Sequence, residues 1–164
     1  MRADDAILAI LDAVPSHRIE GKKRLQKLVH LASLLEPRLN VNFRIHHYGP
    51  FSAELANAAD YLSLMGKIRE DLSPVGIYGT FKSVYSAPED IEINSRFKGR
   101  PLEAIKKIDA YSTVDLEVAS TIAFFVSKGF DRKDALKKTK ELKPTKSTPA
   151  VLKRAEQVLT VVGL

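Results

Sequence analysis

Apolar residues recur at helical spacing in the first part of the chain. Residues 4–14 carry apolar side chains three and four positions apart, and Pro15 follows them directly. Such a stripe is typical of an amphipathic helix that a proline ends. A second stripe covers residues 21–35, and cations crowd its first turns. We therefore predict two helices, the first of them capped by Asp4 or Asp5.

The segment that follows changes its period. Residues 41–47 alternate between apolar and polar side chains, which predicts a strand. A Gly-Pro pair at positions 49 and 50 interrupts the pattern. Ser52 is placed to cap a helix over residues 53–65, and Gly66 is a suitable terminator. We therefore expect a strand, a sharp turn and a third helix.

A β hairpin is predicted next. Residues 68–72 and 77–85 form its arms, and the sequence Ser-Pro-Val-Gly at residues 73–76 suits the turn between them. The second arm would carry one apolar face, formed by Ile77, Phe81 and Tyr85. Residues 88–94 show no clear pattern and could hold a short third strand.

The last third of the chain returns to helical spacing. Helices are expected over residues 101–108, 114–127, 132–143 and 149–162. Their caps would be Ser112, which has a capping-box partner in Asp115, then Asp131 and Thr148. The helix over residues 114–127 is apolar nearly all round, so we expect it to be buried at the centre of the fold.

These elements predict a mainly α fold with a small β hairpin. The first three helices, one strand and the hairpin follow the order of a winged helix, which would occupy residues 4–86. The remaining helices would form a C-terminal subdomain over residues 101–162. A chain of 164 residues is long enough to bury a core as one domain, residues 1–164, without a disulfide or metal.

Composition limits the chemistry that we consider. The chain has no cysteine, which excludes disulfides, thiolate zinc sites and a cysteine nucleophile. No apolar run approaches the roughly 18 residues of a membrane span. Two acids precede the first short apolar run, unlike a secretory signal. We expect a cytoplasmic protein that does not enter a membrane.

Positive charge is concentrated in one region. The whole chain has a net charge of +6, from 26 basic and 20 acidic residues. Residues 128–154 hold ten of the basic residues and three of the acidic ones, a local charge of +7. The rest of the chain is therefore nearly neutral. Such a concentration of charge is typical of a surface that contacts anions.

Two short motifs resemble a known family. The motif RLQKLVHL at residues 24–31 is followed, after the predicted strand, by YGPFS at residues 48–52 and by Leu55. Together they resemble the uncharacterised YwgA-like family and, more distantly, the Panacea superfamily, whose members include antitoxins and a protease-adaptor antitoxin. The resemblance implies a mostly helical, winged-helix-like fold. It supplies no catalytic residues, and an antitoxin role does not follow from it.

Signatures of catalysis and metal binding are weak. His46 and His47 are adjacent on a predicted strand, so their side chains point to opposite faces and cannot easily hold one ion, even with help from His30. Ser52 could act as a nucleophile beside His47, but a helix cap explains it fully. We find no nucleophile elbow, paired-carboxylate signature or glycine-rich phosphate loop. We therefore predict no metal site, no cofactor and no enzymatic activity. Our third hypothesis, an enzyme, would require a deep pocket that brings His30, His47 or Tyr48 together with a carboxylate.

Our first hypothesis is a module that binds the backbone of DNA or RNA. The helix over residues 53–65 lacks basic side chains, so it is poorly suited to contact base edges. Phosphate contacts would come instead from the basic C-terminal region and the hairpin. The candidate residues are Lys133, Lys137, Lys140, Lys143, Lys146 and Lys82. The alternative explanation for these lysines is an ordinary solvated face.

Our second hypothesis is a protein-interaction module of antitoxin or adaptor type. The outer face of the helix over residues 53–65 carries Tyr61 and Leu64, which suit contact with protein better than contact with nucleic acid. This hypothesis predicts an apolar surface there, which would bind a partner protein or a second copy of the chain. Both hypotheses could hold for the same molecule.

Overall fold

The protein is mainly helical, with two small sheets. The computed structural model describes residues 1–77, 79–88 and 97–164. The helices of these residues are α1 (Ala3–Ala13), α2 (Lys22–Ser33), α3 (Ala53–Leu64), α4 (Arg100–Ile108), α5 (Thr113–Ser127), α6 (Arg132–Leu142) and α7 (Pro149–Val162). The strands are β1 (Arg18–Glu20), β2 (Arg44–His46), β3 (Gly49–Phe51), β4 (Arg69–Val75) and β5 (Thr80–Ser86). The prediction of a mainly α fold with a small β component is confirmed.

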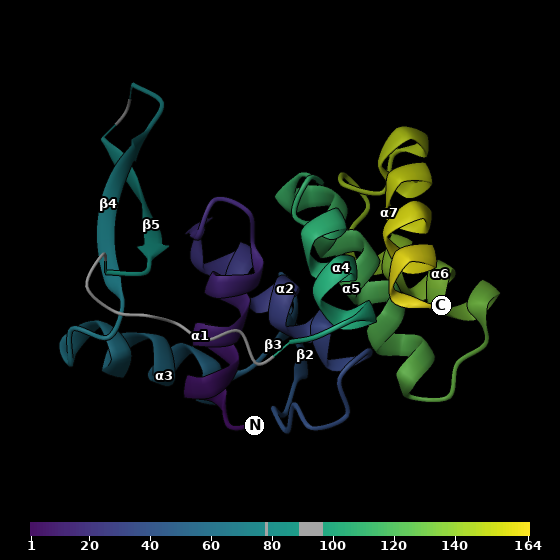
Figure 1. The fold of residues 1–164 in the computed structure, drawn as a ribbon. Helices are drawn as coiled ribbons and strands as arrows, with labels where there is room; N and C mark the ends of the chain where they lie inside the picture. The colour runs from purple at the N-terminus through teal and green to yellow at the C-terminus, as the bar shows by residue number, and fades with distance from the viewer. Residues whose placement is uncertain (78, 89–96) are drawn as a thin grey trace.

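The three-stranded sheet lies at one end of the molecule, beside α1 and α3. Its strand order is β1–β5–β4, and all pairs are antiparallel. Figure 1 shows the β4–β5 hairpin projecting beyond the helices, while α6 and α7 lie at the opposite end. Strand β1 was missed in the sequence because it has only three residues, and its partner strand comes about sixty residues later, with Arg18 opposite Ser86.

The connection inside the β4–β5 hairpin differs from the prediction. Val75 pairs with Thr80, so the turn begins at Gly76 rather than ending there. Pro74 lies within β4, opposite Phe81. Because β4 is at the edge of its sheet, a proline is tolerated in it. Ile77 therefore belongs to the turn and not to a strand face. Most of the unassigned segment 88–94 lies outside the described residues.

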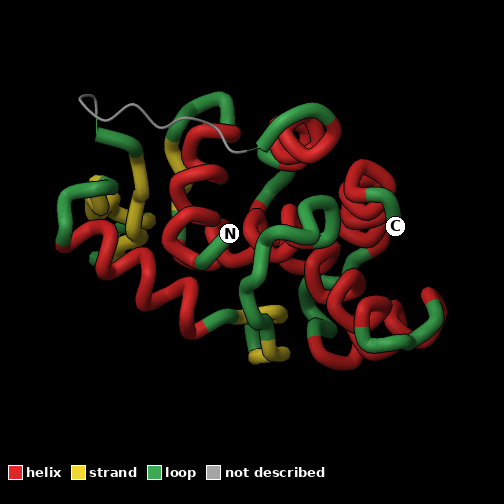
Figure 2. Tube along the Cα trace, turned by 60° about the horizontal axis from the view of Figure 1, so that its bottom comes forward, coloured by secondary structure: helices red, strands yellow, loops and turns green. Residues whose placement is uncertain are grey.

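A second, separate hairpin joins α2 to α3. Strands β2 and β3 pair antiparallel, with Arg44 opposite Phe51 and His46 opposite Gly49. The predicted strand over residues 41–47 was thus too long, and the Gly-Pro pair forms a strand rather than only interrupting one. Figure 2 shows this hairpin away from the three-stranded sheet, against the helices. We call it the β2–β3 hairpin.

The central position predicted for α5 is confirmed. Ten consecutive residues of α5, from Asp115 to Phe124, are buried. This helix packs against α2, α6 and α7 and also contacts β3. The predicted caps of α5, α6 and α7 are confirmed: Ser112, Asp131 and Thr148 each accept a hydrogen bond from a backbone N–H of the first turn. One cluster of buried apolar side chains extends from α1 to α7.

Among the helices that the structure describes, none is both long enough and apolar enough to cross a membrane.

Candidate functional site

The two sequence motifs contact each other in the fold. Gln26 Nε2, on α2, donates to the carbonyl oxygen of Ser52 at 2.9 Å, and the Ser52 N–H donates back to Gln26 Oε1 at 2.9 Å. Lys27 Nζ, one position along α2, donates to the carbonyl oxygen of Pro50 at 2.6 Å. The side chains of the first motif therefore bind the main chain of the second. This contact fixes the β2–β3 hairpin on α2.

Lys27 is unusual because its charge is buried. Only 1% of its surface is exposed, and no carboxylate of the described residues lies within salt-bridge distance of its ammonium. The pKa of Lys27 is lowered to about 8, mainly by burial and also by nearby lysines, and the attraction of Glu117 opposes this change. The group is thus a cation held inside the protein by one carbonyl.

Gly49 allows the β2–β3 hairpin to approach α5 closely. Its φ is +84°, a left-handed conformation that side chains disfavour. A Cβ atom at this position would lie 2.5 Å from Thr121 Oγ1. That hydroxyl is buried and donates to the carbonyl oxygen of Glu117 at 2.7 Å, so it has little freedom to move. Glycine is therefore required here for both conformation and space.

A buried carboxylate secures the other side of this hairpin. Glu117, on α5, is 2% exposed; it accepts from Lys143 Nζ at 2.5 Å and from Lys146 Nζ at 2.8 and 2.9 Å. Burial alone would raise the pKa of Glu117, but the two ammonium groups hold it below its ordinary value. Lys143 Nζ also donates to the carbonyl oxygen of His47 at 3.1 Å. The end of α6 is thereby joined to α5 and to the hairpin.

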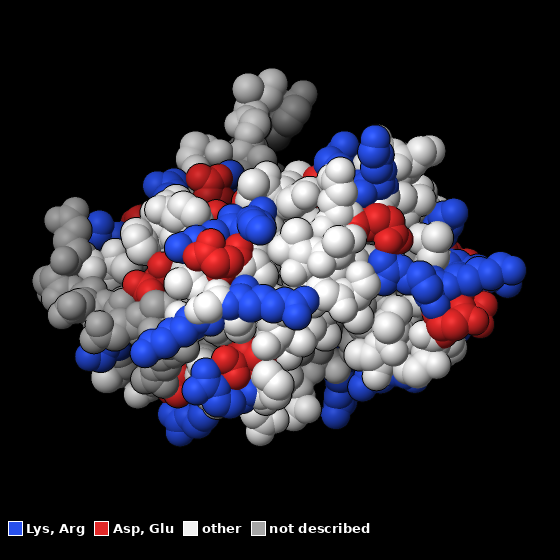
Figure 3. Space-filling view, turned by 45° about the vertical axis from the view of Figure 1, so that its right-hand side comes forward, with Lys and Arg blue, Asp and Glu red and all other residues white. Residues whose placement is uncertain are grey.

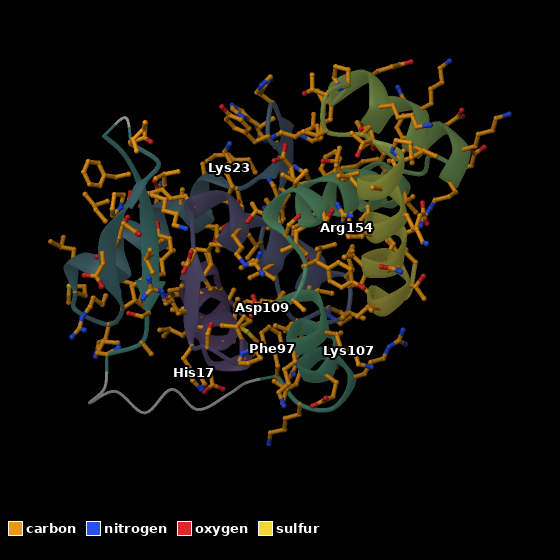
Figure 4. The ribbon with its side chains drawn as sticks, turned by 90° about the horizontal axis from the view of Figure 1, so that it is seen from above. His17, Lys23, Phe97, Lys107, Asp109 and Arg154 are labelled. Atoms are coloured by element: carbon orange, nitrogen blue, oxygen red, sulfur yellow. The ribbon has the colours of Figure 1, made fainter. Side chains whose placement is uncertain are left out.

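The other cations at the start of α2 have partners as well. Lys22 Nζ lies 3.6 Å from carboxylate oxygens of Asp60 and Glu70. Lys23 Nζ lies 3.5 Å above the centre of the Tyr48 ring. Cations are unfavourable near the positive end of a helix dipole, and these contacts offset that cost. In Figure 4, Lys23 lies on the opposite side of the helices from His17 and Phe97.

Arg24 attaches α2 to the end of α4. Its Nη2 contacts Asp109 Oδ1 at 2.8 Å, and its Nη1 donates to the carbonyl oxygen of Tyr111 at 2.9 Å. Figure 4 shows Asp109 at the centre of the molecule, between α1 and α4. Thus the first motif binds two segments of the chain: Gln26 and Lys27 hold the main chain of Pro50 and Ser52, and Arg24 holds the end of α4.

The histidines are placed as aromatic and hydrogen-bonding side chains. His30 Nδ1 lies 2.9 Å from Ser120 Oγ, and its ring packs edge-on against Phe43. Burial, with a smaller contribution from Lys27, lowers the pKa of His30 to about 3. The rings of His46 and His47 pack near Tyr48. The described residues contain no group of three or more side chains arranged to hold a metal ion.

A pocket of about 170 Å³ lies between α2, α3 and the β2–β3 hairpin. We call it the α2–α3 pocket. Its apolar walls are formed by Leu25, Phe51, Leu55, Ala56, Ala59 and Tyr85. Its polar lining includes Lys22, Lys23, Lys27, His46, Tyr48 and Asp60. The pocket thus combines one apolar hollow with three cations and one carboxylate, and Asp60 is already near Lys22.

Comparison with known proteins gives one informative match. No family model matches the chain, and no solved structure matches it. YwgA from Bacillus subtilis (strain 168), an uncharacterised protein, is 29% identical to this chain over 119 residues, which are 67% of this chain and 68% of YwgA. The resemblance to the YwgA-like family is confirmed. The more distant resemblance to the Panacea superfamily stays a prediction.

The lysines proposed for phosphate binding divide into two groups. Lys133, Lys137 and Lys140 are exposed on α6, and no carboxylate of the described residues lies within 4 Å of their ammonium groups. The other three are occupied. Lys143 and Lys146 bind Glu117, as described above, and Lys82 Nζ lies 2.6 Å from Glu20 Oε2. Lys143 is moreover buried, so its ammonium is not accessible to an external phosphate.

The local charge of +7 is smaller in the folded protein. Four of the ten basic side chains in residues 128–154 bind carboxylates that lie outside that segment. These carboxylates belong to Asp115, Glu117 and Glu156. Figure 3 accordingly shows basic and acidic groups interleaved over the face that carries the C-terminal helices. Counting charge along a segment cannot detect such pairs, because the carboxylates come from other helices.

Gly49→Ala should destabilise the protein by about 2–4 kcal/mol, because left-handed strain adds to a clash with α5. Gly66→Ala is the matched control, since Gly66 has a φ of +65° but no atom within 4 Å of the added Cβ. It should cost only about 1–2 kcal/mol. Urea unfolding of the two variants measures the difference. Equal losses would contradict the close contact between Gly49 and Thr121.

The buried ammonium predicts how stability changes at alkaline pH. The unfolded chain keeps the Lys27 proton up to its ordinary pKa of 10.5, whereas the folded protein loses it near pH 8. The unfolded state therefore binds more protons between these values, and the stability of the native protein should rise with pH there. Relative to Lys27→Met, it should gain roughly 2 kcal/mol between pH 7 and pH 10. Urea unfolding at several pH values measures the free energy of unfolding of both proteins. If this free energy changes with pH equally in the two, Lys27 is not a buried cation.

Proposed function

We propose that the protein is a non-enzymatic, winged-helix-like module that binds another protein through the end of α3 and the β4–β5 hairpin. The winged-helix assignment is supported by the order α1, β1, α2, α3 and hairpin, together with the strand order β1–β5–β4. In such a unit the hairpin projects as a wing beside the third helix. Strand β1 completes the sheet of the β4–β5 hairpin. The β2–β3 hairpin is an addition between the second and third helices.

The observation that carries this proposal is the distribution of exposed apolar side chains. Of 13 large hydrophobic residues exposed in the described part of the chain, seven lie between residues 61 and 81. We call them the α3–hairpin surface: Tyr61, Leu64, Met65, Leu72, Val75, Ile77 and Phe81. Leu72 and Phe81 share one face of the hairpin, and Val75 lies on its other face. Leu64 is 85% exposed and Ile77 is 88% exposed. Such a concentration is typical of a surface that another protein covers.

Enzymatic use of the α2–α3 pocket is less well supported. Tyr48 and Asp60 both line it, as the enzyme hypothesis requires. However, Asp60 is placed near Lys22, and no hydrogen bond of the described residues joins it to Tyr48. The His30 side chain lies elsewhere, against Ser120 and Phe43. Binding therefore fits the observations better than catalysis does.

Capture of the tagged protein from its own cells, after nuclease treatment, tests the interaction. We expect a partner that is retained by the native protein and lost with the double variant Leu64→Ser, Ile77→Ser. The control is Val114→Ser with Leu164→Ser, which removes exposed apolar groups elsewhere. Both double variants should unfold within about 1 kcal/mol of the native protein, because exposed substitutions cost little. Identical captured proteins for all three would contradict the proposal.

Light scattering covers the case in which the partner is a second copy. The native protein would then be a dimer, and the double variant Leu64→Ser, Ile77→Ser would be a monomer. A monomeric native protein that also captures no specific partner would remove the basis of the proposal.

The second candidate function is binding to the backbone of DNA or RNA. It is favoured by the unpaired stripe of Lys133, Lys137 and Lys140, which lie three and four positions apart on α6. Contacts of this type bind phosphates without reading sequence, and they weaken steeply as salt is added. This surface lies on the opposite side of the molecule from the β4–β5 hairpin, so the two functions are compatible.

Titration of duplex and single-stranded DNA and RNA at several salt concentrations tests the second candidate. Replacing Lys133, Lys137 and Lys140 by glutamine should reduce the slope of log affinity against log salt by about three, one unit for each phosphate contact. The charge-matched control replaces Lys67, Lys98 and Lys107, which are exposed elsewhere. If both triple variants bind equally, or if native protein does not bind at low ionic strength, α6 is not a phosphate surface.

A further inference from the structure

We infer that the α2–α3 pocket binds an acidic peptide segment of the partner protein, with one aromatic or aliphatic side chain of that segment inside the pocket. This inference rests on the proposed function, because it names the partner's chemistry. Neither of the two sequence motifs assigns a ligand to this pocket. The argument comes from its size, its charges and its continuity with the α3–hairpin surface.

The size of the pocket fits a single side chain. Its volume is about 170 Å³, and a protein cavity of about 150 Å³ accommodates benzene. The walls are aliphatic and aromatic, and they include Leu25, Leu55, Phe51 and Tyr85. A phenylalanine or leucine side chain would fill this space. Buried apolar anchors of this kind supply most of the affinity of many protein–protein contacts.

The charges at the pocket favour an anion beside the anchor. Of the three lysines that line it, only Lys22 lies within salt-bridge distance of carboxylates of the described residues, those of Asp60 and Glu70. Lys23 contacts the Tyr48 ring, and Lys27 has the Pro50 carbonyl as its one hydrogen-bond partner among the described residues. An ammonium has three N–H donors, so the exposed Lys23 can still bind a carboxylate, while the buried charge of Lys27 adds to the positive potential of the pocket. A partner with acidic residues next to the anchor would supply those carboxylates.

The pocket also continues into the exposed hairpin. Tyr85 lines the pocket and lies opposite Glu70 in the sheet. Alternate residues of a strand share one face, so Phe81 and its neighbours Pro74 and Leu72 lie on the same face as Tyr85. A peptide anchored in the pocket could therefore extend along apolar groups that are already exposed. This continuity favours a peptide over a free small molecule as the occupant.

Blocked pentapeptides provide a direct test, with binding followed by the amide NMR signals of the protein. The probes are Gly-Asp-Phe-Asp-Gly, its asparagine form Gly-Asn-Phe-Asn-Gly, and its alanine form Gly-Asp-Ala-Asp-Gly. We expect the acidic phenylalanine peptide to shift signals of α2, α3 and the β2–β3 hairpin. The asparagine form should bind about tenfold more weakly, and the alanine form should not shift these signals. Phenylacetate, tested alone, represents the small-molecule alternative.

Two pairs of variants locate the binding. Ala56→Leu fills the pocket from α3 and should abolish binding, whereas Ala53→Leu places the same side chain on an exposed position of that helix and should not. Lys23→Gln should weaken the acidic peptide about fivefold, and the exposed control Lys98→Gln should leave it unchanged. Equal binding to Ala56→Leu and Ala53→Leu, equal binding of the asparagine peptide, or binding of phenylacetate as tight as that of the peptide would overturn the inference.

The inference and the proposed function can fail separately. A cellular partner that is lost with Leu64→Ser, Ile77→Ser but retained by Ala56→Leu would leave the proposed function standing and remove the pocket from it. Specific peptide binding without any cellular partner or dimer would leave the pocket as a peptide site and remove the proposed function.

Discussion

The attachment of the β2–β3 hairpin to α2 is the contact on which the rest of the structure depends. Gln26 and Lys27 satisfy buried main-chain groups of Pro50 and Ser52, and each such group left unpaired would cost about 1–3 kcal/mol. Ser52 then caps α3 by accepting from the Leu55 N–H. The direction of α3, and with it the position of the β4–β5 hairpin and one wall of the pocket, therefore follows from two side chains of α2.

This dependence changes the interpretation of the two motifs that resemble the YwgA-like family. Arg24, Gln26 and Lys27 bind the chain itself, and Gly49 is the position at which the hairpin meets α5. The motifs thus describe an architecture rather than a chemistry. A protein with this resemblance is expected to share the hairpin and its attachment, while the surfaces that meet a partner lie mostly outside the motifs.

The sequence predicted what depends on neighbouring residues and missed what depends on distant ones. The helices were predicted because their periodicity is a local signal, and so are caps such as Ser112. The predicted cap of α1 was wrong, because that helix begins at Ala3 after Arg2, so Asp4 and Asp5 lie inside its first turn. Strand β1 is recognisable only from its pairing with β5, and Pro74 imitates a turn proline because an edge strand tolerates it. The same limit applies to the site: nothing local shows that Glu117 neutralises Lys143 and Lys146 from another helix.

The charge of Lys27 is more than the fold requires. Gln26 shows that a neutral amide on the same helix can hold the main chain of this hairpin. A buried ammonium costs free energy that a neutral donor would not, as its pKa of about 8 indicates. The hydrogen bond to Pro50 therefore does not by itself account for a cation at this position. A carboxylate that a partner brings to the α2–α3 pocket would, because Lys27 lines that pocket and its charge would attract the carboxylate from within the protein.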